Sequence, residues 1–127
     1  MATAIVAGLC RAGRSSEIHV ADSNPDQRAR LAAQYGVQVS ATLPELCTDD
    51  VLVLAVKPQD MQAACAAIRP NGALVLSIAA GLGVDTLSRY LGGTHRIVRV
   101  MPNTPAKVGL GVAGLFAASG ASAADRQ

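Results

Sequence analysis

Strand-like apolar runs alternate with helical segments along most of this 127-residue chain. The strongest run, Val51 to Val56, is uniformly apolar and rich in β-branched residues, which is typical of a strand covered on both faces. The runs from Ala73 to Ile78 and from Arg96 to Met101 each follow a segment with helical character. This alternation predicts βαβ units, and therefore an α/β fold with a doubly wound, mainly parallel sheet.

Glycines, prolines and capping residues set the ends of the predicted elements. Asn24-Pro25 is typical of a helix start, and Gly36 is typical of a helix end. We predict helices over residues 3–12, 25–35, 43–48, 59–68 and 84–91, strands over 17–21, 37–40, 51–56, 73–78 and 96–101, and a late edge strand within 108–116.

Composition and charge exclude several classes of protein. Apolar residues make up 50% of the chain and charged residues 16%, which excludes intrinsic disorder and suits a single domain, placed at residues 1–118. The formal net charge is +2, and the arginines are dispersed, with no basic block that could neutralise a nucleic-acid backbone. Aromatic residues make up only 2% of the chain, too few for base stacking. We expect no nucleic-acid partner.

The cysteines and histidines show no metal or redox pattern. Cys10, Cys47 and Cys65 are odd in number and lack both close-pair spacing and a C-x-x-C motif, and neither His19 nor His95 has partners at zinc-ligand spacing. We therefore expect free thiols in a reducing cytoplasm and no metal site. The uncharged stretch 72–84 is shorter than the roughly 20 residues that span a bilayer, so no membrane segment is expected.

Two predicted strands end at prolines. Val51 to Val56 is followed by Lys57-Pro58, and the run from Arg96 is followed by Pro102-Asn103-Thr104-Pro105. Proline fixes φ and biases the preceding residue toward extended geometry, and ligands of open α/β sheets bind beyond the carboxyl ends of strands. Together with Ser77-Ile78-Ala79-Ala80-Gly81, these segments resemble the N-terminal domain of pyrroline-5-carboxylate reductase, from residue 1 to about residue 118.

The resemblance implies a Rossmann-like NAD(P)-binding domain from an enzyme of cytoplasmic proline biosynthesis. The complete enzyme is expected to be a homo-oligomer that reduces 1-pyrroline-5-carboxylate to L-proline with NAD(P)H. No catalytic residue is assigned, because the sequence shows no Asp or Glu placed to donate the imine proton. Lys57 follows a strand at a turn, where a lysine is more often a solvated charge than a proton donor. The resemblance implies cofactor contacts at Ser23, Asn24, Ala55, Val56, Lys57, Pro58, Ala79, Ala80 and Gly81, and substrate-side positions at Asn103 and Thr104.

The turn Asp22-Ser23-Asn24-Pro25 bears on the choice of cofactor. It follows the predicted strand 17–21, where the adenosine ribose of a dinucleotide is bound. Asp22 suits free ribose hydroxyls and would repel a 2′-phosphate, whereas Ser23 and Asn24 suit such a phosphate, and the turn itself contains no arginine. Capping of the following helix explains the same residues without a ligand. The resemblance favours NADP, with NAD left open.

The chain also departs from the family pattern. Family members begin with a strand and a turn of the type G-x-G-N-M-A, and Met1-Ala2 stands where that turn ends. We therefore expect a sheet truncated at its N-terminal strand, with residues 119–127 as a linker or the start of a missing helical domain. Two alternatives stay open: a non-catalytic remnant or interaction module with the same fold, and a related NADP-dependent oxidoreductase.

Overall fold

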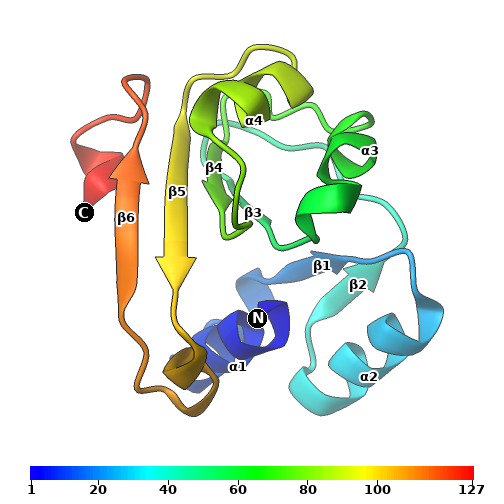
Figure 1. The fold of residues 1–127 in the computed structure, drawn as a ribbon. Coiled ribbons are helices and arrows are strands. Elements are labelled where there is room, and N and C mark those ends of the chain that lie inside the picture. Colours follow the sequence, from blue (N-terminus) through cyan, green and yellow to red (C-terminus); the bar gives the residue numbers. More distant parts are fainter. The chain divides into compact units, whose positions relative to one another are not determined.

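The computed structural model describes residues 1–127, which form two compact units (Figure 1). Unit 1 contains Met1–Pro44 and Thr104–Gly111, and unit 2 contains Glu45–Asn103 and Val112–Gln127. In both units parallel strands alternate with helices along the chain. The predicted α/β fold with mainly parallel strand pairing is confirmed.

Unit 1 is a small α/β layer. It contains the helices α1 (Ala2–Arg11) and α2 (Pro25–Tyr35) and the strands β1 (His19–Ala21) and β2 (Gln38–Ser40), which pair in parallel. The two helices contact each other, and α2 contacts β2. The core of this unit consists of Val6, Leu31 and Val37, with Cys10, Ile18, Val20, Tyr35 and Val39 packed around them.

The ends of α2 follow the signals in the sequence. The Asn24 Oδ1 atom accepts hydrogen bonds from the backbone N–H groups of Asp26 (2.9 Å) and Gln27 (3.4 Å), and Pro25 occupies the first helical position. Gly36 ends the helix in the left-handed conformation (φ 66°), which carries little steric cost for glycine.

Unit 2 contains a four-stranded sheet with the order β3-β4-β5-β6 (Figure 1). The strands β3 (Val51–Leu54), β4 (Leu74–Ser77) and β5 (Ile97–Pro102) are parallel, and β6 (Ala113–Ala117) pairs antiparallel with β5 at the edge. The late edge strand expected within 108–116 is therefore confirmed. The helices α3 (Met61–Cys65) and α4 (Val84–Tyr90) connect the parallel strands.

One face of this sheet is well buried. The register aligns Leu52 with Val75 and Val75 with Ile97, so these side chains share a face, and each is at most 5% exposed. Met61 on α3 and Leu87 on α4 are also fully buried. The two helices therefore cover this face with branched and flexible aliphatic side chains, as the low aromatic content requires.

The opposite face is only partly covered, which corrects the expectation that residues 51–56 are buried on both faces. Val51 and Val53 are 54% and 37% exposed. Ala121 covers this face at Leu74 and Val98, on the two central strands. Because this short C-terminal cover consists of small residues, β3 keeps one solvated face.

Two predicted helices are wrong or too long. Residues 43–48 form no helix, because Pro44 disfavours helical geometry at the residue before it and the segment is short. In place of a helix over 59–68, Pro58–Asp60 form a 3₁₀ turn and α3 ends at Cys65. The other predicted helices and the predicted parallel strands are confirmed, with their ends moved by at most two residues, whereas β6 begins five residues into the predicted range 108–116 and ends one residue beyond it.

An ion pair fixes the C-terminal segment in unit 2. The Arg96 guanidinium donates from Nε and Nη2 to the Asp125 carboxylate (2.9 and 2.7 Å), and Nη1 donates to the carbonyls of Thr48 and Gly72. The Asp125 side chain is 5% exposed. The guanidinium, followed by the backbone N–H of Ser122, holds the pKa of the Asp125 carboxyl far below its usual range. Whether residues 119–127 lead into another domain stays a prediction.

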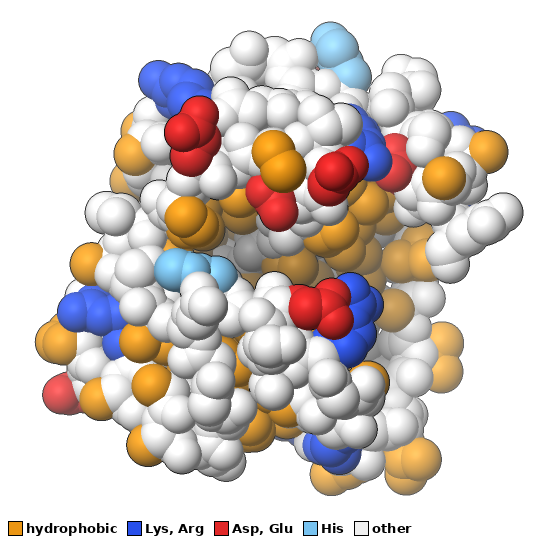
Figure 2. Space-filling view, turned by 180° about the vertical axis from the view of Figure 1, so that it is seen from behind, with side chains coloured by type: hydrophobic (Ala, Val, Ile, Leu, Met, Phe, Trp, Pro, Cys, Tyr) orange, Lys and Arg blue, Asp and Glu red, His pale blue; other side chains and the backbone are white.

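Charged side chains are dispersed on the face drawn in Figure 2, where Lys and Arg groups stand apart from one another. None of the helices in the structure has the length and apolar character needed to cross a bilayer.

We predict that Asp125→Asn lowers the melting temperature at pH 7, because Arg96 loses its carboxylate partner. The depressed pKa means that this stabilisation is fully present above the unfolded pKa of about 4 and is lost as pH falls through the lower folded value. Melting curves from pH 7 down to pH 3 should therefore show the difference from the unmodified chain shrinking below about pH 4. The matched control is Glu45→Gln, at an exposed carboxylate. A difference independent of pH would contradict the assignment.

Candidate functional site

The register of the parallel strands brings three predicted segments to one edge of unit 2. Leu54 and Ser77, the last residues of β3 and β4, pair with each other, and Ser77 pairs with Arg99 on β5. The chain therefore leaves β3 and β4 at the same row, into 55–58 and 78–81. β5 continues for three residues, about 10 Å, to Pro102 and is followed by Asn103. This carboxyl edge is where ligands of open α/β sheets bind.

At the carboxyl edge, the segment 55–58 exposes its backbone and one positively charged side chain, that of Lys57. Val56, Lys57 and Pro58 are exposed, and Ala55 is half-buried. The Lys57 carbonyl accepts a hydrogen bond from the Asp60 N–H (3.0 Å) at the start of the 3₁₀ turn, and its amine forms neither of the two ion pairs in the structure. The Lys57 amine is thus available to an anion.

The segment 79–81 presents small residues at the same edge. Ala79 is buried, and its backbone N–H lies 3.4 Å from the Ser77 Oγ atom. Ala80 and Gly81 are exposed, and Gly81 has φ 75°, a conformation that side-chain-bearing residues rarely adopt. No side chain beyond a methyl group shields this backbone, which allows close approach of a ligand.

Asn103 has a structural role that the sequence did not reveal. Its backbone N–H donates to the Val112 carbonyl (3.2 Å), and its Oδ1 atom accepts from the Val112 N–H (3.0 Å). These two bonds close the loop of residues 104–111. The side-chain Nδ2 group keeps its hydrogens for another acceptor. Thr104 is exposed, begins the 3₁₀ turn η3 (Thr104–Val108) and belongs to unit 1.

The turn after β1 carries the remaining predicted residues, in unit 1. Asp22 Oδ1 accepts from the Asn24 N–H (2.8 Å), and Asn24 caps α2. Ser23 is exposed. The sequence interpretation missed Arg28, whose Nη1 donates to the carbonyls of Asp22 (2.7 Å) and Ser23 (3.1 Å). The sequence could have indicated this contact, because Arg28 follows Asn24 by four residues and therefore lies one helical turn from the start of α2.

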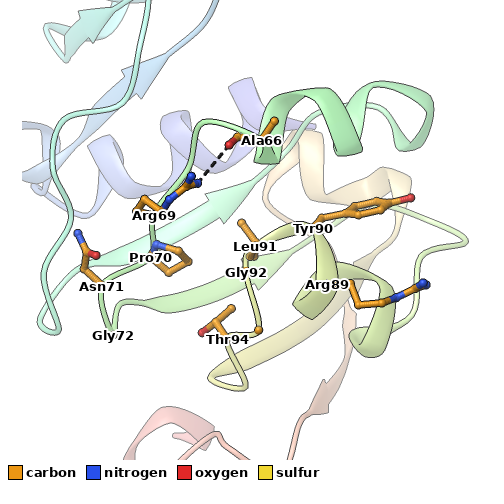
Figure 3. A pocket seen from close by; sticks show the side chains of 11 residues that line it. Ala66, Arg69, Pro70, Asn71, Gly72, Arg89, Tyr90, Leu91, Gly92 and Thr94 are labelled. Atoms are coloured by element: carbon orange, nitrogen blue, oxygen red, sulfur yellow. Dashed lines mark hydrogen bonds between the residues drawn. The ribbon is translucent and has the colours of Figure 1, made fainter.

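A cavity of about 700 Å³ lies elsewhere, at the amino ends of β4 and β5 (Figure 3). Arg69 and Arg89 are among its lining residues, but each is already bonded to protein: Arg69 to the carbonyls of Ala66 and Ile68, and Arg89 to the Thr86 hydroxyl. Figure 3 shows Arg69 directed at Ala66. Neither arginine is therefore free for a ligand, and the cavity is at the opposite end of the strands from the segments 55–58 and 79–81.

Thiol and metal chemistry receive no support from the geometry. Cys65 is buried, and burial raises the pKa of its thiol, which makes it a poor nucleophile. The structure contains no group of three or more His, Cys, Asp or Glu side chains placed to hold a metal ion.

Comparison with known proteins gives consistent results. Residues 1–81 match the family model described as NADP oxidoreductase coenzyme F420-dependent. Pyrroline-5-carboxylate reductase from Pseudomonas aeruginosa is 40% identical over 98% of this chain and 47% of its own length. The solved structure of a pyrroline-5-carboxylate reductase from Coxiella burnetii superposes with a TM-score of 0.86 at 31% identity, over 98% of this chain and 48% of that one.

A further solved relative was determined with a cofactor. Plasmodium falciparum pyrroline carboxylate reductase with NADP bound superposes with a TM-score of 0.62 at 27% identity, over 73% of this chain and 37% of that one. The chain spans about half the length of the relatives that it matches. The resemblance seen in the sequence motifs is confirmed, and the match covers an NAD(P)-binding oxidoreductase domain.

We predict that Asn24→Ala lowers the free energy of unfolding by about 1 kcal/mol, because two N–H groups of α2 lose their acceptor. Asn24→Ser should retain most of that stability, since serine also caps helices. Urea unfolding followed by circular dichroism measures both. Equal stability of the alanine variant and the unmodified chain would show that the cap is dispensable.

Proposed function

The chain belongs to the family of NADP oxidoreductases, coenzyme F420-dependent, and on this basis we propose that it forms the NAD(P)-binding part of a pyrroline-5-carboxylate reductase. In the complete enzyme, a bound reduced nicotinamide supplies a hydride. The hydride adds to the imine carbon of 1-pyrroline-5-carboxylate and a proton adds to the ring nitrogen, giving L-proline. The observation that carries the proposal is the 40% identity to the Pseudomonas aeruginosa reductase over 98% of this chain.

The residues at the carboxyl edge of unit 2 fit a dinucleotide. The small residues of 79–81 and the positive φ of Gly81 leave room for close backbone approach, and Lys57 offers a positive charge. We assign cofactor contacts to Ala55, Val56, Lys57 and Pro58 and to 79–81. These contacts would orient the cofactor through shape and backbone, since most of the side chains are apolar.

We propose NADP as the preferred cofactor, with Ser23, Asn24 and Arg28 around its 2′-phosphate. The Ser23 hydroxyl and the Asn24 side-chain amide are short donors on an exposed turn. Arg28 holds the carbonyls of the same turn and adds the positive charge that the turn itself lacks. Asp22 opposes this preference, but one of its carboxylate oxygens is already bonded to the Asn24 N–H.

On the substrate side we propose that Asn103 and Thr104 position the imine. The Asn103 Nδ2 group is the free donor, since Oδ1 is engaged with Val112. None of the proposed contact residues is an acid, so the donor of the imine proton is expected outside this set of residues. We further propose that the complete enzyme is a cytoplasmic homo-oligomer.

The first test is calorimetric titration of the chain with NADPH and with NADH. We expect saturable binding with a lower Kd for NADPH. Arg28→Gln should raise the Kd for NADPH by about tenfold, as loss of one charge-assisted contact implies, and change the Kd for NADH less. The matched control is Arg30→Gln, at an exposed arginine of the same helix whose side chain reaches only the Thr3 hydroxyl, at 3.5 Å.

The possible results separate the competing functions. No binding of either cofactor by a folded sample would refute the proposal for this chain and favour a non-catalytic remnant with the same fold. Binding with tighter NADH, unaffected by Arg28→Gln, would keep the dinucleotide site and reject the NADP assignment.

A further inference from the structure

Arg99 occupies the last row of the parallel ladder in unit 2. The register aligns Leu54, Ser77, Arg99 and Phe116 across the four strands, and β3 and β4 both end at this row. The segments 55–58 and 78–81 begin immediately after it. Arg99 is therefore the cationic side chain in the row that borders the candidate ligand edge.

The guanidinium of Arg99 lacks a protein partner. Arg99 is partly buried, its Nε atom is buried without a hydrogen-bond partner, and neither ion pair of the structure includes it. Arg96, three residues earlier on the same chain segment, instead bonds to Asp125 and two carbonyls. A buried donor of a charged group that lacks an acceptor is destabilising, and a bound ligand with an acceptor oxygen would remove that cost.

No carboxylate of the structure forms an ion pair with Arg99. Its neighbours in the row are aliphatic, neutral polar or aromatic, and the segments 55–58 and 79–81 contain no Asp or Glu. Lys57 adds a second cation to the same edge. At this edge neither Arg99 nor Lys57 forms an ion pair with a carboxylate, which favours a ligand that brings its own negative oxygens.

We propose that Arg99 binds an anionic oxygen group of the ligand held at the carboxyl edge of β3, β4 and β5, a carboxylate or a phosphate. This inference rests on the proposed function, in which the substrate carries a carboxylate and the cofactor carries phosphates. The planar guanidinium can donate two parallel hydrogen bonds to either group. Arg99 is thus a binding residue additional to those that the sequence motifs indicated.

The direct test follows the Nε–H resonances of the arginines by NMR, with the Arg99 signal identified by its loss in Arg99→Lys. The unmodified chain is titrated separately with inorganic pyrophosphate and with L-proline, at constant ionic strength. We expect at least one probe to shift the Arg99 signal saturably. Arg69 and Arg89 are internal controls, because they bond to protein acceptors at the opposite end of the strands.

The two probes distinguish the source of the anion. A response to pyrophosphate alone assigns Arg99 to a phosphate of the cofactor, and a response to L-proline alone assigns it to the substrate carboxylate. A response to both supports the shared anion site. An unmoved Arg99 signal with both probes, or equal shifts of Arg69 and Arg89, overturns the proposal.

Calorimetry with NADPH separates this inference from the proposed function. If the anion is a phosphate, Arg99→Gln raises the Kd for NADPH about tenfold or more, whereas Arg89→Gln, which removes the same charge from an exposed site, leaves it unchanged. An unmodified chain that binds no NADPH contradicts the proposed function, and the pyrophosphate and L-proline titrations still decide the role of Arg99. An unmodified chain that binds NADPH while Arg99 responds to neither probe retains the function and loses the inference.

Discussion

The parallel pairing of β3, β4 and β5 is the constraint on which the rest of unit 2 depends. Leu54, Ser77 and Arg99 align in one row of the sheet. The segments that follow β3 and β4 therefore begin side by side at the same edge, independently of the conformation that each segment adopts. The same register places Leu52, Val75 and Ile97 on the face that α3 and α4 cover. Burial of that apolar face stabilises the ladder, and the ladder in turn fixes where small residues and cations meet at its edge.

Two arginines close together in the sequence illustrate how position decides the use of a charge. Arg96 precedes β5 and is at its amino end, where the C-terminal segment returns and brings Asp125 to it. Arg99 is within β5, next to the last residue of β4, and no segment of unit 2 brings it a carboxylate. Arg96 therefore binds the C-terminal segment of its own chain, whereas Arg99 has no protein partner and is proposed to bind an anion of the ligand.

The sequence predicted what local chemistry determines and failed where distant contacts decide. The uniform apolar runs and the Asn24-Pro25 start of α2 led to correct elements, because strand burial and helix capping act over a few residues. Val51 and Val53 are exposed because the C-terminal segment covers the central strands and not β3. The sequence of residues 51–56 contains no information about this distant contact. The closure of the loop by Asn103 and Val112 joins residues nine positions apart and was likewise hidden.

The turn after β1 shows why composition alone left the cofactor undecided. Asp22 and Ser23 support opposite preferences when they are considered as isolated side chains. In the structure, the Asp22 carboxylate accepts the Asn24 N–H, and Arg28 binds the carbonyls of both Asp22 and Ser23. Local bonding thus engages part of the negative charge and places a cation beside the turn. The charge at this turn therefore depends on Arg28, a residue outside the turn, and for this reason the turn sequence by itself could not settle the choice of cofactor.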